Sequence, residues 1–359
     1  MKTLPAARPV AGLLQTWGGM AKYRGRPHLA SALYRAALAL DGSLQRSRRE
    51  LAKSRPRSKG QVRHIQSLIL GTTGTCNASC IHCPTGKAAT ANVPRGTMPM
   101  PIFRKIIDGI VEEGVAIDSH IGFGLFGDGL VDPLVMERAQ YVHARIPDAL
   151  LSVNTNGAAY NAARHAGLFP YVTLLALHCE SLTPETYDRL MTPLRGRNVF
   201  PKYEAILRDF PGKVRVSVPV SRLNLGDIGA MRDWFMERGA KEVVFDPMSS
   251  RCVEDRRLFD RLSLSPYPIR CDAEVTRDLI VDCDGVVLPC CNDFAREQPI
   301  GNLAFETFRE TMLSLTRRQF AEKMARQKHD EIPLCSRCFG DVRTPDFPFD
   351  HPIRSADGE

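Results

Sequence analysis

Three cysteines within eight residues constrain this chain more than any other feature of its sequence. Cys76, Cys80 and Cys83 have the spacing C-x3-C-x2-C and follow the apolar run HIQSLILGTT at 64–73. Thiolates are soft ligands that select iron–sulfur clusters or zinc. Zinc sites usually come as two C-x2-C-type pairs, and no second pair lies near this group. The spacing therefore indicates a [4Fe–4S] cluster with three protein ligands, whose fourth iron is open to an exogenous molecule.

From residue 65 onward, short apolar runs alternate with amphipathic helical patterns. Six such units predict a parallel sheet with helices outside it, curled into a partial (β/α)6 TIM-like barrel. Functional residues of such folds lie at the carboxyl ends of strands, where the first cysteine group falls. The predicted strands are 64–73, 116–127, 149–157, 171–178, 213–220 and 241–247, and the helical patterns include 101–114, 134–146 and 226–240.

Two further regions flank the predicted barrel. Residues 1–65 hold 14 Lys and Arg against two acidic residues, and the run 29–40 has a helical composition. Near the C-terminus, two apolar runs flank the Asp284-Gly285 turn as in a β-hairpin, and a helical stretch follows at 304–327. We therefore expect a basic helical extension, the α/β barrel, a small α+β cluster domain and a tail. Their expected bounds are 1–64, 65–265, 266–345 and 346–359.

The charge of the chain is concentrated in the extension. The net charge is +8, whereas the segment 1–65 alone carries +12. This segment is either a solvated arm or a docking surface for an acidic partner. It holds only Trp17, Tyr23 and Tyr34 as aromatic residues, so we expect no nucleic-acid partner. No apolar run is long enough to predict a membrane span, and no secretory signal is recognisable, so we expect a cytoplasmic protein.

A second cysteine set lies near the C-terminus, with the order Cys271, Gly285-x4-Cys290 and Cys335-x2-Cys338. Four thiolates can saturate one further [4Fe–4S] cluster. A structural zinc site with four cysteine ligands is the alternative. Cys283 and Cys291 compete for a ligand role. The Gly-x4-Cys spacing favours Cys290, and Cys291 remains a possible substitute.

The segment CNASCIHC at 76–83 resembles the CxxxCxxC motif of the radical S-adenosylmethionine (SAM) enzymes, and the resemblance extends over about residues 65–250. It implies that SAM binds the open iron through its amino and carboxylate groups. One-electron reduction then gives a 5′-deoxyadenosyl radical, which abstracts a hydrogen atom from substrate. The electron would come from an external donor such as flavodoxin or ferredoxin. The second set resembles the Twitch domain, a shortened SPASM domain. No cysteine follows Cys338, which implies one auxiliary cluster and two [4Fe–4S] clusters in all.

The resemblance also implies contacts with SAM near the first two strands. His82 occupies the position before the third cysteine, where the family often has an aromatic residue near the adenine. The segment GLFGDG follows the second strand, where the family has a Gly-Gly-Glu element whose backbone meets the methionyl amine. Gly127 and Asp128 match that element with Asp in place of Glu.

Further implied contacts follow the later strands. The family often has a Ser-x-Asp-Gly-like stretch near the ribose after its fourth strand, and His178 and Glu180 stand at the corresponding positions. His178 has the alternative role of capping the strand end. Asn156 follows the third strand and Asn224 the fifth, where the family places cofactor or substrate contacts.

The leading hypothesis for function is a radical SAM oxidoreductase of the dehydrogenase type. Its expected substrate is a small polar, sugar-like or aminocyclitol-like metabolite, and the auxiliary cluster would accept an electron from the substrate radical. Such a reaction needs a base near the substrate hydroxyl. Asp246 and Arg251, at or just after the end of the sixth strand, are the candidate catalytic residues. Surface ion pairs are their alternative role.

Three other functions remain open at this stage. A peptide maturase would use the same cofactors, although residues 1–65 show no strand pair suited to a peptide-recognition module. An epimerase would use Cys252 as its hydrogen-atom donor. Cys179 and Cys252 otherwise fit buried small hydrophobes. The non-enzyme alternative is a zinc-binding module.

Overall fold

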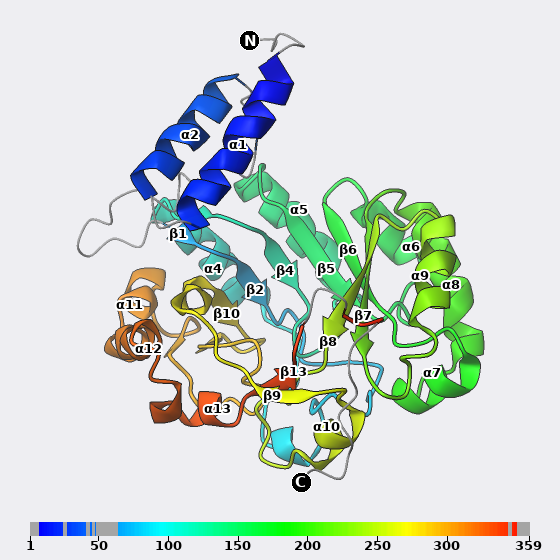
Figure 1. Ribbon diagram of the computed structural model, residues 1–359. Helices are drawn as coiled ribbons and strands as arrows, with labels where there is room; N and C mark the ends of the chain where they lie inside the picture. The colour runs from blue at the N-terminus through cyan, green and yellow to red at the C-terminus, as the bar shows by residue number, and fades with distance from the viewer. Residues whose placement is uncertain are drawn as a thin grey trace.

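The computed structural model describes residues 7–23, 27–40, 44, 47, 64–343 and 347–349. Its centre is a nine-stranded sheet with the strand order β12-β11-β10-β2-β4-β5-β6-β7-β8 (Figure 1). The strands of this sheet are β2 (Leu68–Leu70), β4 (Ile121–Phe123), β5 (Leu151–Thr155), β6 (Leu174–His178), β7 (Val214–Val220), β8 (Glu242–Pro247), β10 (Leu279–Val281), β11 (Val286–Leu288) and β12 (Gly301–Asn302).

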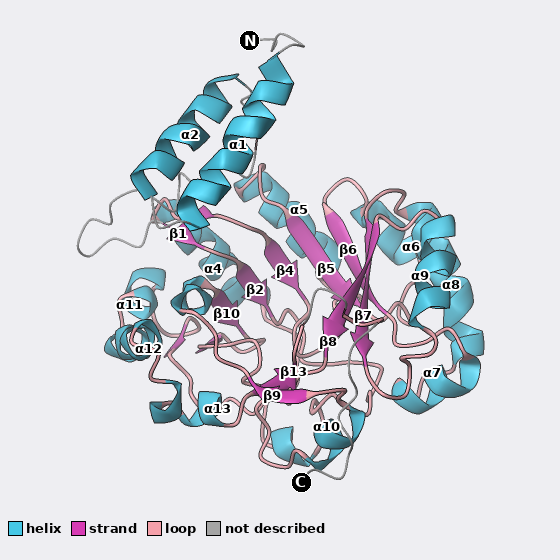
Figure 2. Ribbon diagram, in the orientation of Figure 1, coloured by secondary structure: helices cyan, strands magenta, loops and turns pink. Residues whose placement is uncertain are grey.

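The strands from β2 to β8 form the predicted parallel barrel sheet. Neighbouring strands pair in chain order and in parallel, with Leu70 opposite Phe123 and Phe123 opposite Val153. Among the described residues β8 pairs only with β7, so the barrel is open, as the partial (β/α)6 barrel predicted. Helices pack outside it (Figure 2). They are α4 (Met100–Glu112), α5 (Val135–Arg145), α6 (Ala162–His165), α7 (Pro184–Leu190), α8 (Gly196–Asp209) and α9 (Ile228–Glu237).

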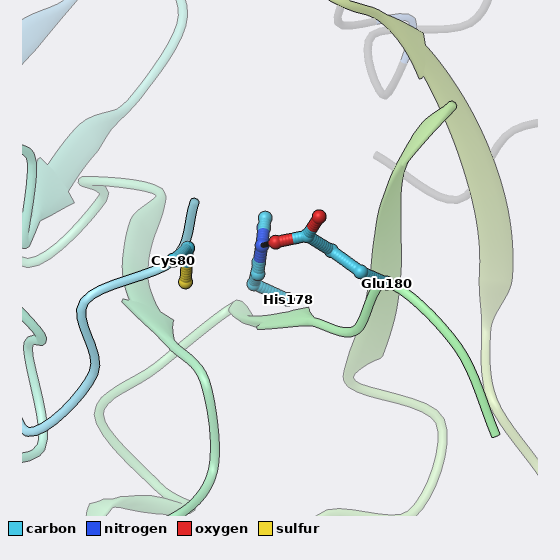
Figure 3. Close-up of side chains that lie close together, drawn as sticks. All are labelled: Cys80, His178 and Glu180. Atoms are coloured by element: carbon cyan, nitrogen blue, oxygen red, sulfur yellow. Dashed lines mark hydrogen bonds and ion pairs between the residues drawn. The ribbon is translucent and has the colours of Figure 1, made fainter. Parts of the chain in front are cut away.

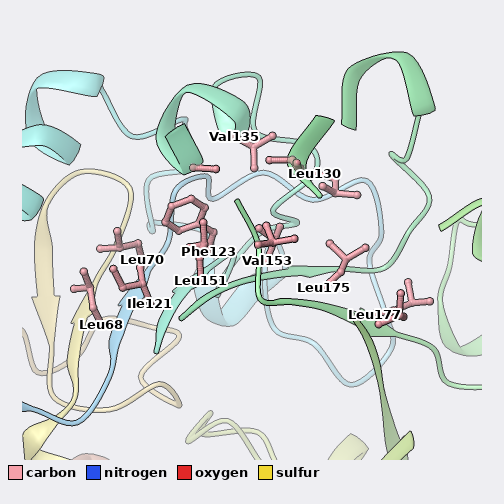
Figure 4. Packing of buried hydrophobic residues seen from close by; sticks show 14 of the residues in the cluster. Leu68, Leu70, Ile121, Phe123, Leu130, Val135, Leu151, Val153, Leu175 and Leu177 are labelled. Atoms are coloured by element: carbon pink, nitrogen blue, oxygen red, sulfur yellow. The ribbon is translucent and has the colours of Figure 1, made fainter. Parts of the chain in front are cut away.

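The hydrophobic core lies between the sheet and these helices (Figure 4). Leu68, Phe123 and Val153 come from three successive strands and are fully buried. Leu130 and Val135 pack against them from the segment that follows β4. Burial of one such side chain contributes about 1.5–3 kcal/mol to folding. This core fixes the strand ends from which the site is built.

The C-terminal region continues the barrel sheet. The predicted hairpin is present as β10 and β11, which pair antiparallel around Gly285, and Gly285 has a φ of 90° that favours glycine. β10 also pairs in parallel with β2, so this hairpin adds to the edge of the barrel. The remaining elements of this region are α10 (Arg257–Leu262), β9 (Pro266–Pro268), α11 (Phe308–Met312), α12 (Leu315–Ala325), α13 (Pro333–Ser336) and β13 (Phe339–Asp341).

Two N-terminal helices, α1 (Ala7–Tyr23) and α2 (Pro27–Leu40), pack against each other and project from the barrel (Figure 1). The composition of 29–40 indicates α2, whereas α1 was not expected. The two-stranded pair β1 (His64–Ile65) and β3 (Ala116–Ile117) follows. Most of the basic linker and of the tail lies outside the described residues. No helix in the described part of the chain has the length and apolar character to cross a membrane.

Candidate functional site

The first cysteine loop leaves the carboxyl end of β2, as predicted. The Ser79 N–H donates to the Thr192 carbonyl at 2.6 Å, and the Ile81 N–H donates to the Leu190 carbonyl at 2.9 Å, at the end of α7. Lys87 stabilises the loop, because its Nζ donates to the carbonyls of Cys80 at 2.6 Å and Ile81 at 2.8 Å. Sequence reasoning missed Lys87, since a single lysine carries no distinguishing pattern.

The three thiols of this loop lie close enough to affect one another's ionisation. Burial raises the pKa of Cys76 to about 11, and the neighbouring Cys83 adds to that rise. Burial also raises the pKa of Cys80 well above its usual value, with the Glu180 carboxylate and the other two thiols as further causes. Metal binding deprotonates such thiols, and the positive charge of the metal offsets the repulsion between the resulting thiolates. The donor set therefore fits an iron–sulfur cluster held by three thiolates.

Asn156 joins this loop to the end of β5. Its Nδ2 donates to Asn77 Oδ1 at 2.8 Å and lies 3.6 Å from Cys76 Sγ. Its Oδ1 accepts the Ala158 N–H at 2.9 Å. The predicted site residue Asn156 thus contacts a predicted cluster ligand directly.

Gly127 and Asp128 lie after β4, in contact with the same loop. A Cβ on Gly127 would lie 2.4 Å from the Thr75 carbonyl oxygen, so only glycine permits this approach. The Asp128 carboxylate is buried and accepts from the N–H groups of Leu130 at 2.9 Å and Asn156 at 2.7 Å. It also accepts from Thr155 Oγ1 at 2.9 Å. The Asp128 side chain therefore holds the strand ends together.

Glu180 lies close to both His82 and His178, and Figure 3 shows His178 and Glu180 beside Cys80. The Glu180 carboxylate is buried, and its Oε1 lies 3.3 Å from His82 Nδ1 and 3.2 Å from His178 Nε2. Although burial raises its pKa, the two imidazoles lower the pKa of Glu180 to about 2. Ligand atoms of Cys80, His178 and Glu180 all lie within 4.8 Å of one another. His82 and His178 thus lie beside the same carboxylate, and their contact with SAM stays a prediction.

Asn224 is hydrogen-bonded to the backbone of the segment that carries Glu180. Its Nδ2 donates to the Glu180 carbonyl at 2.6 Å and the Pro219 carbonyl at 2.9 Å. Its Oδ1 accepts the Ser221 N–H at 2.7 Å. All of these partners are protein groups, and Asn224 is fully buried. The amide therefore fixes the segment that carries Glu180, and direct contact of Asn224 with a cofactor stays a prediction.

Asp246 and Arg251 do not contact each other. Asp246 lies near the end of β8, where its carboxylate accepts a hydrogen bond from Ser217 Oγ of β7. The Arg251 guanidinium reaches the C-terminal region, where Nη1 donates to Asn292 Oδ1 at 3.1 Å and the group stacks 5.3 Å from the Phe294 ring centroid. The two residues therefore belong to different parts of the site.

The second cysteine set converges in the C-terminal region. Cys271, Cys290, Cys335 and Cys338 pack into one cluster with Cys252. Burial raises the pKa of Cys335 to about 11, with Cys338 and Cys271 as further causes. Like the first loop, this group of free thiols fits an iron–sulfur cluster.

Of the two competing cysteines, Cys283 lies apart from this set and Cys291 lies beside it. Cys283 packs in the barrel core, with its Sγ 3.8 Å from the Pro94 carbonyl oxygen. Cys291 is more exposed than Cys290, but its thiol is close enough to those of Cys290, Cys271 and Cys338 to affect their ionisation. The choice of Cys290 over Cys291 as the ligand therefore stays a prediction.

Comparison with known proteins bears on the C-terminal region and on the fold. Residues 271–339 match the SPASM family, an iron–sulfur cluster-binding domain. No curated protein matches the chain. Among solved structures, BtrN in complex with AdoMet and 2-DOIA is 15% identical, covers 76% of this chain and 92% of its own, and has a TM-score of 0.51.

Two other solved structures contain peptides. Native anSMEcpe with bound AdoMet and Cp18Cys peptide is 15% identical, with a TM-score of 0.55 and coverage of 76% of this chain and 88% of its own. SuiB of Streptococcus suis bound to the precursor peptide SuiA is 11% identical, with a TM-score of 0.54 and coverage of 82% and 76%.

These likenesses define the class of the fold. The chain has the fold of the radical SAM enzymes, with a C-terminal iron–sulfur cluster-binding domain of the SPASM family, as the two cysteine motifs predicted. The expected cofactors, SAM and more than one [4Fe–4S] cluster, agree with these findings.

Proposed function

We propose that this protein is a radical SAM oxidoreductase that oxidises a small polar metabolite of the sugar or aminocyclitol class. One observation carries the proposal: the chain presents two separate thiol groups, three thiols at the barrel strand ends and a larger set in the SPASM-type region. A three-thiol site suits a cluster that binds SAM, and a four-thiol site suits a cluster that only transfers electrons.

The residues that would hold each cofactor follow from the contacts described above. Cys76, Cys80 and Cys83 would ligate the first cluster. The auxiliary ligands would be Cys271, Cys290, Cys335 and Cys338. When bound, the first cluster and SAM supply a 5′-deoxyadenosyl radical that removes a hydrogen atom from an unactivated C–H bond.

The group around Glu180 would position SAM beside the first loop. His178 is hydrogen-bonded to the buried Glu180 carboxylate beside Cys80, and His82 Nδ1 lies 3.3 Å from the same carboxylate. Asn156 and Gly127 would shape the opposite side, through the Cys76 contact and the close approach to Thr75.

Asp246 would take the proton of the substrate hydroxyl. It lies at the strand-end side of β8, where barrel enzymes place such groups, and the Ser217 hydroxyl orients its carboxylate. The Arg251 guanidinium, held by Asn292, would bring positive charge between the barrel and the auxiliary site. An external low-potential donor such as flavodoxin or ferredoxin would supply the first electron, and the oxygen sensitivity of the clusters suits the cytoplasm.

Peptide modification is the second candidate, because two of the similar solved structures contain peptides, whereas BtrN contains 2-DOIA. Epimerisation has less support, since Cys252 packs with the auxiliary thiols. A zinc-binding module would leave the match to an iron–sulfur domain unexplained.

Deuterium transfer distinguishes these functions. The reconstituted protein is incubated anaerobically with dithionite, SAM and either aminocyclitols deuterated at their carbinol carbons or deuterated peptides. We expect deuterium in 5′-deoxyadenosine and a ketone product from an aminocyclitol. Transfer from peptides alone would establish the maturase, and transfer without a change in substrate oxidation state would establish the epimerase. Absence of transfer from every aminocyclitol contradicts the proposed substrate class.

A further inference from the structure

Cys252 is the fifth thiol of the auxiliary site. It is 3% exposed and lies in one packed cluster with Cys338, Phe320 and Met324, against which the other predicted ligands pack. The SPASM match begins at residue 271, so it does not include Cys252. A [4Fe–4S] cluster takes four thiolates, and five thiols converge here.

Hydrogen bonds of Ser250 hold the segment of Cys252 against the segment of Cys338. Ser250 makes the connection: its N–H donates to the Phe339 carbonyl at 2.8 Å, and its Oγ accepts the Phe339 N–H at 3.1 Å. The same Oγ donates to the Arg337 carbonyl at 3.1 Å and accepts the Cys252 N–H at 3.4 Å. One serine therefore contacts the residue on each side of Cys338 and Cys252 itself.

The backbone at Cys252 has an unusual conformation. Arg251 and Cys252 have φ angles of 53° and 56°, a left-handed conformation that non-glycine residues rarely adopt. Such strain persists only where surrounding contacts impose it, and it concentrates at functional sites. Cys252 and Cys338 thus belong to one packed cluster of side chains, and Ser250 joins their backbones.

We propose that Cys252 is a non-ligating residue of the auxiliary site, whose S–H donates a hydrogen bond to the Cys338 thiolate and so raises the reduction potential of the auxiliary cluster. A hydrogen bond to a ligand sulfur stabilises the reduced, more negative cluster. The inference rests on the proposed function, because a higher potential makes the cluster a better acceptor of the substrate's electron.

The test isolates the auxiliary cluster. The background is the full chain with Cys76→Ala, Cys80→Ala and Cys83→Ala, which should hold about four irons. Cys252→Ala and Cys252→Ser are added to it separately. We expect unchanged iron content in both, a shift of the midpoint potential to more negative values in Cys252→Ala, and a smaller shift in Cys252→Ser, which keeps a donor.

The control is Cys179→Ala, since Cys179 is fully buried in the barrel core and its Sγ donates to the Ser181 carbonyl at 3.3 Å. Loss of iron in Cys252→Ala would make Cys252 a ligand, and a potential equal to that of the control would exclude the hydrogen bond. Either result overturns the proposal. Should Cys252→Ala not fold, Cys252→Val removes the donor with less loss of volume, and the same outcomes apply. Absence of iron in the background variant itself contradicts the proposed function instead.

Discussion

The Asn156 side chain reaches from the end of β5 to Cys76, with 3.6 Å between Nδ2 and Sγ. The backbone N–H of Asn156 donates to the Asp128 carboxylate at 2.7 Å. Asn156 follows β5, Asp128 follows β4 and the cysteine loop follows β2, so these hydrogen bonds join the ends of three strands. The position of the Cys76 thiol depends on this connection.

Removal of the Asn156 amide should weaken the first cluster. A hydrogen bond to an ionised thiolate contributes about 1.5–3 kcal/mol, so Asn156→Ala should release the iron of this cluster to a chelator about tenfold faster or more. Iron of the auxiliary site should leave at its usual rate. Asn154→Ala is the matched control, because Asn154 lies on the same strand and donates to the Gly124 carbonyl instead. Equal release rates in the two variants would contradict the proposed contact.

Asp128→Asn should destabilise the fold. The buried carboxylate accepts from Thr155 and from two backbone N–H groups, and an amide would turn a donor toward some of them. The free energy of unfolding in urea should fall by about 2–4 kcal/mol. The exposed Asp233→Asn should change it by less than about 0.5 kcal/mol. A stable Asp128→Asn variant would show that the carboxylate is not needed to hold the strand ends.

His165 should make stability depend on pH. Burial lowers its pKa from 6.5 to about 4, and its Nδ1 accepts the Asn161 N–H at 3.0 Å. The unfolded chain therefore binds a proton near pH 6.5 that the folded chain binds only near pH 4. Stability from this residue is complete above pH 6.5 and is lost as the pH falls toward 4. Between pH 7.5 and pH 5 the loss should be about 2 kcal/mol.

The comparison variant for this prediction is His165→Phe, which cannot titrate. Its urea midpoint should fall less between pH 7.5 and pH 5 than that of the unsubstituted protein. At every pH it should also differ by a constant amount, because the acceptor for the Asn161 N–H is missing. Parallel curves for the two proteins from pH 7.5 to pH 5 would show that His165 has no role in it.

Asp246→Asn should separate SAM cleavage from substrate oxidation. An amide cannot accept the hydroxyl proton, so the rate of oxidised-product formation should fall about 10²- to 10⁴-fold. The substrate-free formation of 5′-deoxyadenosine should stay within about twofold of the unsubstituted protein. Asp260→Asn, at a half-buried residue of α10, is the control. An Asp246→Asn variant with normal oxidation would exclude Asp246 as the base.

Local patterns predicted the parts of this fold that depend on chain-adjacent residues. The apolar runs placed all six barrel strands, and the Asp284-Gly285 turn placed the hairpin. The parallel pairing of β10 with β2 could not be foreseen, because it joins residues about 210 positions apart and leaves no periodic signal. Helix α1 was not predicted, because it holds a proline and three glycines, which have low helix propensity.

The site shows the same division. Cysteine spacing located both thiol groups, since their ligands are close in sequence or carry a recognisable turn. The pairing of His82 with Glu180 brings together two loops, and the contact of Cys252 with Cys338 brings together segments that lie far apart in the chain. Such contacts depend on tertiary packing, so Cys252 was assigned to the barrel site by its place after a strand.

The central claim is that Cys76, Cys80 and Cys83 hold a cluster with one iron open to SAM. The most direct measurement compares the anaerobically reconstituted protein with the variant in which all three are alanine. The account predicts about eight irons per chain, a cluster EPR signal that changes when SAM is added, and formation of 5′-deoxyadenosine. The variant should keep about half of the iron and lose both the SAM response and 5′-deoxyadenosine. Continued formation of 5′-deoxyadenosine in the variant would contradict the account.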